Sequence, residues 1–410
     1  MGIELRTPAD DDWAAICAFD GRTFGATYTP DEVERRRPMH DLGRFRMLLD
    51  GRQIVGVAGS YALDATLPGR RVVPMGGVTW VGVAATHRRR GLMRRLIGAV
   101  HDDIDARGEP LATLYGSEGG IYHHVGYGTG TRTRFISIDV RSANMRAGVR
   151  QKVGELTSSA PDRESSNSVR YLEGDAIVPA LERIWNRFRL ERAGEVGRSR
   201  AYHEYAVADG ATERDGFSAV AHLAHRDGYA SYRTKMEWND GHPSHTVAVG
   251  ELAAVTPAAH AALWHTLLNL DLVGTITSRA VAIDDPLPML LDNPRAVRTT
   301  GLNDGVWLNV RDVPACFGGR TYRTTDRIVL DVDGVRWAID GGPDGATCKV
   351  VRSRPDLTTT GGPFSALLYG GVLPSSLVAG GWMSARNAAA LARADLFFTT
   401  SLEPHCQSHY

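Results

Sequence analysis

Three arginines followed by a glycine, Arg88-Arg89-Arg90-Gly91, stand between an apolar run and an amphipathic one. Residues 78–84 are apolar and β-branched, which predicts a buried strand, and residues 92–104 repeat apolar side chains at helical spacing. Backbone N–H groups in the first turn of a helix lack intrahelical partners and face an anion with the positive end of the helix dipole. The segment is therefore predicted to bind phosphate, although three adjacent arginines are also common on ordinary solvated surfaces.

Elements that alternate between helix and strand surround this segment in residues 1–143. Thr29 followed by Pro30 and Glu32 has the pattern of a capping box, which predicts a helix start. Strands are expected at 45–49, 54–61, 111–115 and 131–140, the last of them closing the first domain. This order of elements predicts an α/β domain.

The same order recurs between residues 174 and 270. A helix at 174–193, a strand pair at 217–226 and 228–238, a buried strand at 246–255 and a helix from 257 to 270 follow a polar stretch at 151–168, interpreted as a solvated connector or a mobile loop. Thr256 and Pro257 stand where the first copy has its arginines. We expect a second copy that keeps the scaffold and has lost the phosphate site.

Residues from about 296 onward have a different texture, with frequent Gly and Pro. Strands at 306–310, 327–332 and 335–340, a short helix and turn at 366–380, a helix at 387–396 and a last strand at 397–401 predict a compact α+β module. The chain is thus expected to hold three domains, at 1–146, 147–294 and 295–410.

Composition bounds the classes of function. Of the 410 residues, 47 are Lys or Arg and 47 are Asp or Glu, so no global positive field favours nucleic acid. The four cysteines are scattered and indicate neither a metal site nor a disulfide framework. The start of the chain lacks the apolar core of a signal peptide, and no window is apolar enough to span a membrane. These features predict a cytoplasmic protein, with unconventional secretion left open.

Two motifs resemble the GCN5-related N-acetyltransferases (GNAT). The pyrophosphate loop of that superfamily is written Q/R-x-x-G-x-G/A; Arg88 and Gly91 match it, and Met93 departs from its small last residue. The stretch from Ile121-Tyr122 to Gly126-Tyr127 matches a second signature, in which the tyrosine is the general acid. The resemblance implies acetyl-CoA as cosubstrate and Tyr122 as the acid. Tyr115 and Tyr127 compete for this role as neighbouring tyrosines, and the spacing to Gly126 distinguishes Tyr122 from them.

Three further stretches, 117–122, 295–300 and 341–345, are similar to the enhanced intracellular survival (Eis) family. Members of that family join an acetyltransferase domain, a degenerate copy of it and a C-terminal domain similar to sterol carrier proteins. The resemblance implies amine acceptors, namely aminoglycosides acetylated at several positions or a protein lysine, and a homohexamer.

The resemblance also implies a base and a coenzyme site. The base would be the C-terminal carboxylate of Tyr410, where the family typically ends in Phe; Glu403, His405 and His409 could substitute, and a frayed tail is the structural alternative. The alternative for residues 81–83 is an ordinary core strand, which is compatible with a role in binding the coenzyme. Residues 117–118 could equally be the N-cap and first turn of the next helix. The expected coenzyme residues are Val81, Gly82, Val83, Arg88, Arg89, Arg90, Gly91, Leu92, Met93, Arg94, Ser117 and Glu118.

The acceptor pocket has three weaker candidates, Asp20, Phe24 and Trp80, for which core packing or helix solvation is an equally good explanation. The leading hypothesis is direct transfer of an acetyl group to an amine in a ternary complex. A lipid or sterol carrier and a non-catalytic scaffold that binds acetyl-CoA are the alternatives.

Overall fold

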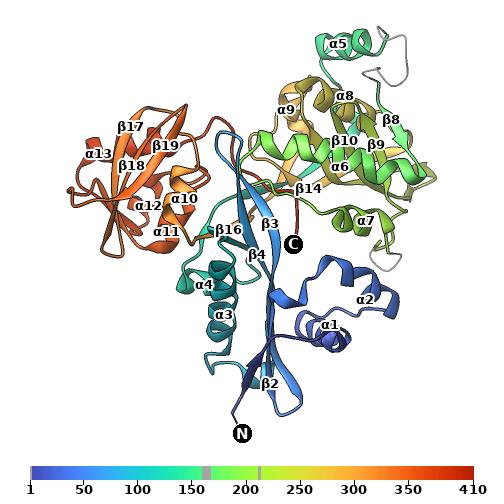
Figure 1. Ribbon diagram of the computed structural model, residues 1–410. Helices are drawn as coiled ribbons and strands as arrows, with labels where there is room; N and C mark the ends of the chain where they lie inside the picture. Colours follow the sequence, from blue (N-terminus) through green and yellow to red (C-terminus); the bar gives the residue numbers. More distant parts are fainter. Residues whose placement is uncertain (1, 159–167, 211–213) are drawn as a thin grey trace. The chain divides into compact units, whose positions relative to one another are not determined.

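The computed structural model describes residues 2–158, 168–210 and 214–410, which form two compact units (Figure 1). The first unit comprises residues 1–131, 192–197 and 304–410, and the second comprises 132–191 and 198–303.

The first unit is built on a seven-stranded sheet with the order β1-β2-β3-β4-β5-β16-β6. Its strands are β1 (Glu4–Arg6), β2 (Phe45–Asp50), β3 (Gln53–Leu67), β4 (Arg71–Val83), β5 (Leu111–Tyr115), β16 (Val306–Val310) and β6 (Gly128–Thr129). β4 and β5 run parallel, whereas β4 with β3 and β5 with β16 are antiparallel.

Helices cover both faces of this sheet (Figure 1). α1 (Trp13–Phe24) and α2 (Pro30–Arg36) lie on one face, and α3 (Leu92–Ala106) lies on the other. α2 begins where predicted, because Thr29 and Glu32 form the reciprocal bonds of a capping box. The buried stripe of α3 consists of Leu92, Leu96, Ile97, Val100, His101 and Ile104.

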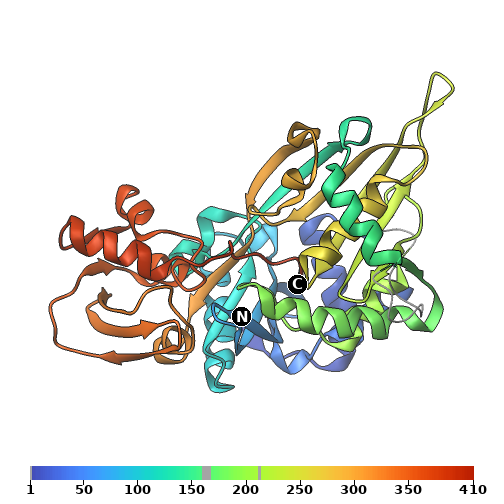
Figure 2. The ribbon, with the colours of Figure 1, turned by 90° about the horizontal axis from the view of Figure 1, so that it is seen from above.

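The second unit repeats this plan. Its sheet has the order β15-β7-β14-β13-β10-β9-β8, with the central pair β13 and β14 again parallel. The strands are β7 (Arg132–Asp139), β8 (Arg170–Leu172), β9 (Ala221–His225), β10 (Gly228–Lys235), β13 (His245–Ala254), β14 (Val273–Val281) and β15 (Val297–Asp304), and the hairpin between β10 and β13 extends into a small ribbon of β11 (Trp238–Asn239) and β12 (His242–Pro243) (Figure 2). The helices are α5 (Ala147–Ser158), α6 (Ile177–Phe188), α7 (Arg200–Ala208), α8 (Pro257–Leu268) and α9 (Leu287–Leu290).

Two strands lie outside the sheets in which the sequence predicted them. β7 was expected to close the first sheet, but it pairs with β14, and its Ile136 and Ile138 belong to the core of the second unit. β16 was expected in the C-terminal module, but it pairs with β5 in the first sheet. An alternating pattern predicts a strand and its buried face, and it carries no information about the partner strand.

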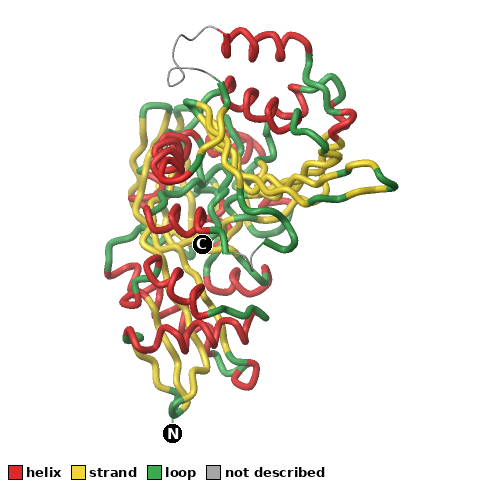
Figure 3. Tube along the Cα trace, turned by 90° about the vertical axis from the view of Figure 1, so that its right-hand side faces the viewer, coloured by secondary structure: helices red, strands yellow, loops and turns green. Residues whose placement is uncertain are grey.

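The remainder of the first unit is an α+β module, drawn in orange and red in Figure 2. Figure 3 distinguishes the helices and strands of the chain by colour. Its sheet has the order β19-β18-β17-β20-β21. The elements are α10 (Val313–Gly318), β17 (Asp326–Val332), β18 (Val335–Gly342), β19 (Gly345–Val350), β20 (Leu357–Thr359), α11 (Gly361–Ala366), α12 (Pro374–Ala379), β21 (Met383–Ala385) and α13 (Ala388–Phe398). The predicted likeness to sterol carrier proteins stays a prediction.

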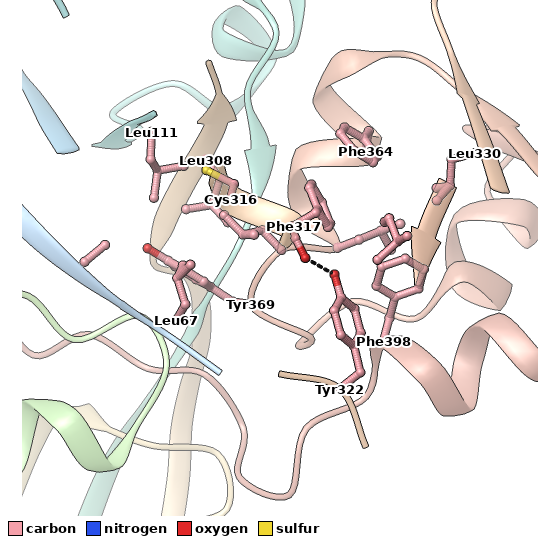
Figure 4. Close-up of a cluster of buried hydrophobic side chains, with 14 of the residues drawn as sticks. Leu67, Leu111, Leu308, Cys316, Phe317, Tyr322, Leu330, Phe364, Tyr369 and Phe398 are labelled. Atoms are coloured by element: carbon pink, nitrogen blue, oxygen red, sulfur yellow. Dashed lines mark hydrogen bonds between the residues drawn. The ribbon is translucent and has the colours of Figure 1, made fainter. Parts of the chain in front are cut away.

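Aromatic side chains fill the core of this module (Figure 4). Phe317 stacks on Phe364 at a centroid distance of 4.3 Å, and the Tyr322 hydroxyl donates to the Phe317 carbonyl at 2.7 Å. The strand predicted at 397–401 is wrong, because Phe397 and Phe398 end α13 and point into this core. The short helix expected at 366–373 instead occupies Gly361–Ala366.

The polar stretch at 151–168 is also corrected in part. Residues 151–158 continue α5, and residues 159–167 lie outside the described part of the chain. Within the described residues, none of the helices has both the length and the apolar character needed to cross a membrane.

Candidate active site

A gap opens between the central parallel strands of the first sheet. β4 and β5 pair only from Met75 to Gly77 on β4 and from Leu111 to Thr113 on β5, although β4 continues to Val83. Beyond the Gly77–Thr113 pair, the edge of β4 is therefore available to an extended ligand.

A bulge on β4 follows shortly after this point along the strand. Val57 and Gly59 on β3 oppose Gly82 and Thr79, so that two β4 residues face one on β3, and Trp80 has a left-handed φ of 56°. The Ala84 N–H donates to the Val55 carbonyl on β3. Because backbone groups alternate along a strand, those of Val81 and Val83 point to the open edge.

Gly82 has a different part in this strand, since its backbone groups point toward β3. A Cβ at this position would lie 3.1 Å from Thr23 and 3.3 Å from Phe19, both on α1. Gly82 thus lets α1 pack closely against β4, while Val81 and Val83 supply the backbone groups that face the gap.

The loop after β4 has the geometry of an anion cradle. Residues 84–91 connect β4 to α3, with Arg89 at φ 62° and Gly91 at φ 72°. Arg88, Arg89 and Arg90 are exposed, and a Cβ on Gly91 would meet nothing within 4 Å. The loop therefore presents its backbone and three guanidinium groups to solvent.

α3 begins at Leu92, directly after this loop. The amides of Leu92, Met93 and Arg94 belong to the first turn, where no intrahelical acceptor exists. Met93 is half-buried in the hydrophobic cluster that contains Val81 and Val83. Its departure from the family pattern leaves the turn intact, because Met93 lies in the regular first turn of α3 and its side chain packs against that cluster. These groups fit the pyrophosphate of a coenzyme.

Tyr122 ends the short helix α4 (Gly119–Tyr122), close to the end of β5. Its side chain is 5% exposed and its hydroxyl hydrogen-bonds to Ser117. Burial raises the pKa of Tyr122, while the bond to Ser117 lowers it by a smaller amount. Glu118 is the N-cap of α4 without a side-chain cap bond, and both Ser117 and Glu118 are exposed.

A second tyrosine, Tyr127, packs against Tyr122. The Tyr127 N–H donates to the Tyr122 carbonyl at 3.1 Å, and their rings meet edge to face at 6.0 Å. The Tyr127 hydroxyl is fully buried and hydrogen-bonds to His101 Nε2 at 2.8 Å. Tyr127 is therefore far less accessible to a reacting group than a general acid requires. Burial lowers the pKa of His101 to about 4.

The C-terminal residue lies at the other side of the same strand junction. The Tyr410 hydroxyl is 2.7 Å from Thr113 Oγ1, and a Cβ on Gly77 would lie 3.0 Å from the Tyr410 ring. Burial raises the pKa of the Tyr410 phenol well above its usual value. The tail is thus packed against the sheet, contrary to the frayed alternative.

Tyr122 and Tyr410 approach the strand junction from opposite faces. Tyr122 clusters with Leu114 on the α3 face, whereas Thr113, which bonds to Tyr410, points to the other face by strand alternation. An extended ligand in the gap would pass between them.

The face that carries Tyr410 also carries aromatic side chains from α1, β3 and β4. Trp80 lies 5.4 Å from Trp13 and 5.1 Å from His40, measured between ring centroids. His40 Nδ1 bonds to the Arg36 carbonyl and must carry the proton, so His40 Nε2 accepts from the Tyr61 hydroxyl at 2.7 Å. Burial lowers the pKa of His40 to about 4, which keeps the ring neutral.

Asp20 and Phe24 lie near this aromatic group on α1. Asp20 accepts a 2.7 Å hydrogen bond from the Tyr28 hydroxyl, and burial raises the pKa of its carboxyl. Phe24 is 52% exposed. Sequence reasoning did not single out Trp13, His40 or Tyr61 as residues of the site.

The second unit keeps the strand bulge and has no comparable loop. Gly250 is the extra β13 residue opposite Ser231 and Tyr232. Only Val255 and Thr256 connect β13 to α8, Pro257 has no N–H, and the Thr256 side chain accepts from the Ala259 amide. This helix start is capped by its own residues.

A buried ion pair stands beside that second bulge. Arg198 donates to Glu251 at 2.5 Å, Tyr229 donates to the other carboxylate oxygen, and the guanidinium lies 3.3 Å from the centre of the Trp185 ring. Burial raises the pKa of Glu251, but the charge of Arg198 and the hydrogen bonds from Arg198 and Tyr229 together outweigh this effect and lower the pKa overall.

Comparison with known proteins agrees with this geometry. A model of the acetyltransferase (GNAT) domain matches residues 4–130, and another matches residues 194–311. The N-acetyltransferase Eis of Mycobacterium tuberculosis strain H37Ra is 32% identical to the chain, and the match covers 98% of both proteins. The chain belongs to the Eis family of GCN5-related N-acetyltransferases.

Other members and solved structures support the assignment to the Eis family. An uncharacterized N-acetyltransferase of Streptomyces avermitilis is also 32% identical over 98% of both chains. The crystal structure of Eis1 from Mycobacterium abscessus matches the whole chain with a TM-score of 0.84 and 26% identity. A GCN5-related N-acetyltransferase from Anabaena variabilis shares the fold at 15% identity and a TM-score of 0.82.

Membership of the Eis family makes the chain an N-acetyltransferase with two GNAT domains, and the predicted α/β class is confirmed. Enzymes of this superfamily take acetyl-CoA as cosubstrate.

Proposed function

We propose that the first unit acetylates primary amines by direct transfer from acetyl-CoA within a ternary complex. The observation that carries the proposal is the approach of Tyr122 and Tyr410 to the β4–β5 junction from opposite faces, next to the anion cradle of residues 84–94. Acetyl-CoA supplies a thioester carbonyl to the gap between the two strands.

Each protein group has one task in this reaction. The backbone groups of Val81 and Val83 align the coenzyme arm along β4, and the loop amides with Arg88 neutralise its pyrophosphate. As the new C–N bond forms and the C–S bond breaks, the Tyr410 carboxylate takes the proton from the amine nitrogen. The Tyr122 hydroxyl returns a proton to the departing thiolate, whose conjugate acid has a pKa of roughly 8.5 in ordinary thiols.

The acceptor enters from the face that carries Trp80, Trp13 and Asp20. Aromatic rings attract cationic groups, and a carboxylate holds an ammonium ion. We propose aminoglycosides, acetylated at several positions, and protein lysines as acceptor classes. A homohexamer in the cytoplasm is the expected form of the protein.

The test combines a panel of acceptors with one variant. Aminoglycosides, polyamines and lysine peptides are assayed for CoA release, and the products are identified by mass spectrometry. We expect acetylated amines from the native protein and at least a hundredfold lower kcat for Tyr122→Phe with unchanged acetyl-CoA binding. A fully active Tyr122→Phe variant would remove Tyr122 from the mechanism, and absence of turnover with every amine would overturn the proposed activity.

A further inference from the structure

The last eight residues, 403–410, form a strap that the rest of the first unit holds along its length. The Arg192 guanidinium donates to the Glu403 carbonyl at 2.6 Å, and the His405 N–H donates to the Ala193 carbonyl at 3.0 Å. His405 and Ser408 are buried at 3% and 1% exposure. The strap is therefore seated in the fold.

A buried carboxylate from another part of the chain, that of Glu195, accepts a hydrogen bond from the middle of the strap. Both oxygens of Glu195, which is 0% exposed, accept from the Gln407 N–H at 3.2 Å. The segment around Glu195 is itself bonded to β3, because the Thr66 N–H donates to the Glu195 carbonyl and the Gly194 N–H donates back to Thr66. Glu195 thus connects the strap to β3, the strand that pairs with β4.

Tyr115 and Thr113 on β5 hold the end of the strap. The Tyr115 hydroxyl donates to the Cys406 carbonyl at 3.3 Å, and its ring stacks on His409 at a centroid distance of 4.6 Å. Thr113 Oγ1 hydrogen-bonds to the Tyr410 hydroxyl at 2.7 Å and also lies 3.4 Å from Met75 Sδ. Thr113 belongs to the last residue pair before the strands separate.

We propose that Thr113 and Glu195 are positioning residues for the terminal carboxylate. Thr113 holds the Tyr410 side chain at the strand junction, and Glu195 holds the backbone three residues earlier. Two points of attachment on a chain end remove most of its conformational freedom, so the carboxylate meets the amine in one place. This inference rests on the proposed function, in which that carboxylate is the base.

The hydroxyl pair can be tested with a double-mutant cycle. Thr113→Val and Tyr410→Phe each remove one partner of the bond while keeping the shape and the terminal carboxylate. We expect each variant to lower kcat about tenfold with unchanged KM for acetyl-CoA, and the double variant to lose no more than either single one. Thr113→Ser, which keeps the hydroxyl, should retain the native kcat.

The role of Thr113 would be overturned if Thr113→Val had the same kcat as the native protein. It would also be overturned if the losses of the two single variants multiplied in the double variant. A purely structural role would also reduce Tm and raise KM for acetyl-CoA. A lower kcat with an unchanged KM for acetyl-CoA in Thr113→Val, together with a native kcat in Thr113→Ser, therefore distinguishes a positioning role from a purely structural one.

Glu195 is tested by Glu195→Ala and Glu195→Gln. The glutamine carbonyl can still accept from the Gln407 N–H, so we expect Glu195→Gln to keep more activity than Glu195→Ala. Hydrogen–deuterium exchange over residues 403–410 should rise in Glu195→Ala and in Thr113→Val. Unchanged exchange in both variants would overturn the inference whatever the activity, whereas an inactive native protein would overturn the proposed function alone.

Discussion

Gly91 is the N-cap of α3, and Gly98 lies seven residues later, in the middle of the same helix. Substitution by alanine is predicted to have opposite effects at the two positions. A Cβ meets nothing within 4 Å at either position, but Gly91 has a φ of 72°. Alanine in that left-handed conformation costs roughly 1–2 kcal/mol, whereas alanine inside a helix is favoured over glycine by roughly 1 kcal/mol.

Gly91→Ala should therefore raise the Kd for CoA about tenfold, because the loop moves away from the geometry that cradles an anion. Gly98→Ala is the matched control, and it should raise the Tm and leave the Kd unchanged. Calorimetric titration with CoA measures both effects. Equal affinities of the two variants would contradict the cradle assigned to residues 84–94.

The pH dependence of the reaction is predicted from Tyr122. Burial raises the pKa of its hydroxyl, so the group stays protonated at neutral pH and the alkaline fall of kcat should lie above pH 10. The hydrogen bond to Ser117 lowers that pKa. Ser117→Ala should therefore move the alkaline limb to higher pH in a kcat profile, and a move to lower pH would argue against Tyr122 as the acid.

Some residues of the candidate site could be predicted from the sequence and others could not. Arg88, Gly91 and Tyr122 follow short local motifs. Trp13, His40 and Tyr61 come from three separate segments and meet only because α1 and the following loop fold over β3 and β4. Their types and spacing carry no sign of that meeting.

At the scale of elements, the two strand–helix junctions differ where function requires it. Eight residues, 84–91, form the loop before α3, whereas two residues precede α8 and Thr256 caps it. An anion at the α8 terminus would compete with that cap, and the two connecting residues, Val255 and Thr256, supply no arginine. Calorimetry should accordingly find one CoA site per chain. A second site of similar affinity would contradict the inference that the second copy has lost its phosphate site.

The buried ion pair of the second unit has a structural consequence. Glu251→Ala leaves the Arg198 guanidinium, whose side chain is 3% exposed, without its carboxylate. Removing one partner of a buried pair costs about 3–5 kcal/mol. We expect that loss in urea-induced unfolding of the second unit, with the Kd for CoA unchanged; Arg200→Ala, which removes an exposed pair with Glu204, serves as the control and should cost less than about 1 kcal/mol.

At the scale of the whole molecule, two buried histidines predict a loss of stability in mild acid. His40 and His101 have pKa values of about 4 in the fold because burial disfavours their charged forms. The unfolded chain, with histidine pKa values near roughly 6.5, binds more protons between these limits. Their contribution is complete above pH 6.5 and is lost as the pH falls toward 4.

This contribution is on the order of 3 kcal/mol for each histidine. Urea unfolding between pH 7 and pH 4.5 measures it. His101→Gln can still accept the Tyr127 hydrogen bond without titrating, so it should flatten the decline. A native protein equally stable at both pH values would contradict the burial of these rings.

The sequence by itself determined the family, the α/β class and the strand–loop–helix at 78–104, because these depend on residues within a few turns of one another. Local spacing sets helix and strand periods and the chemistry of a loop between them. The repeat of the GNAT order was also visible in this way, and it is confirmed by the second domain match.

Only the tertiary structure decided which sheet receives β7 and β16, and where the strap at 403–410 lies. Each depends on pairing between segments far apart in the chain, such as Thr113 with Tyr410 or β5 with β16. Such pairings gain their free energy from burial and hydrogen bonds that exist only once distant segments have met, so no local pattern encodes them.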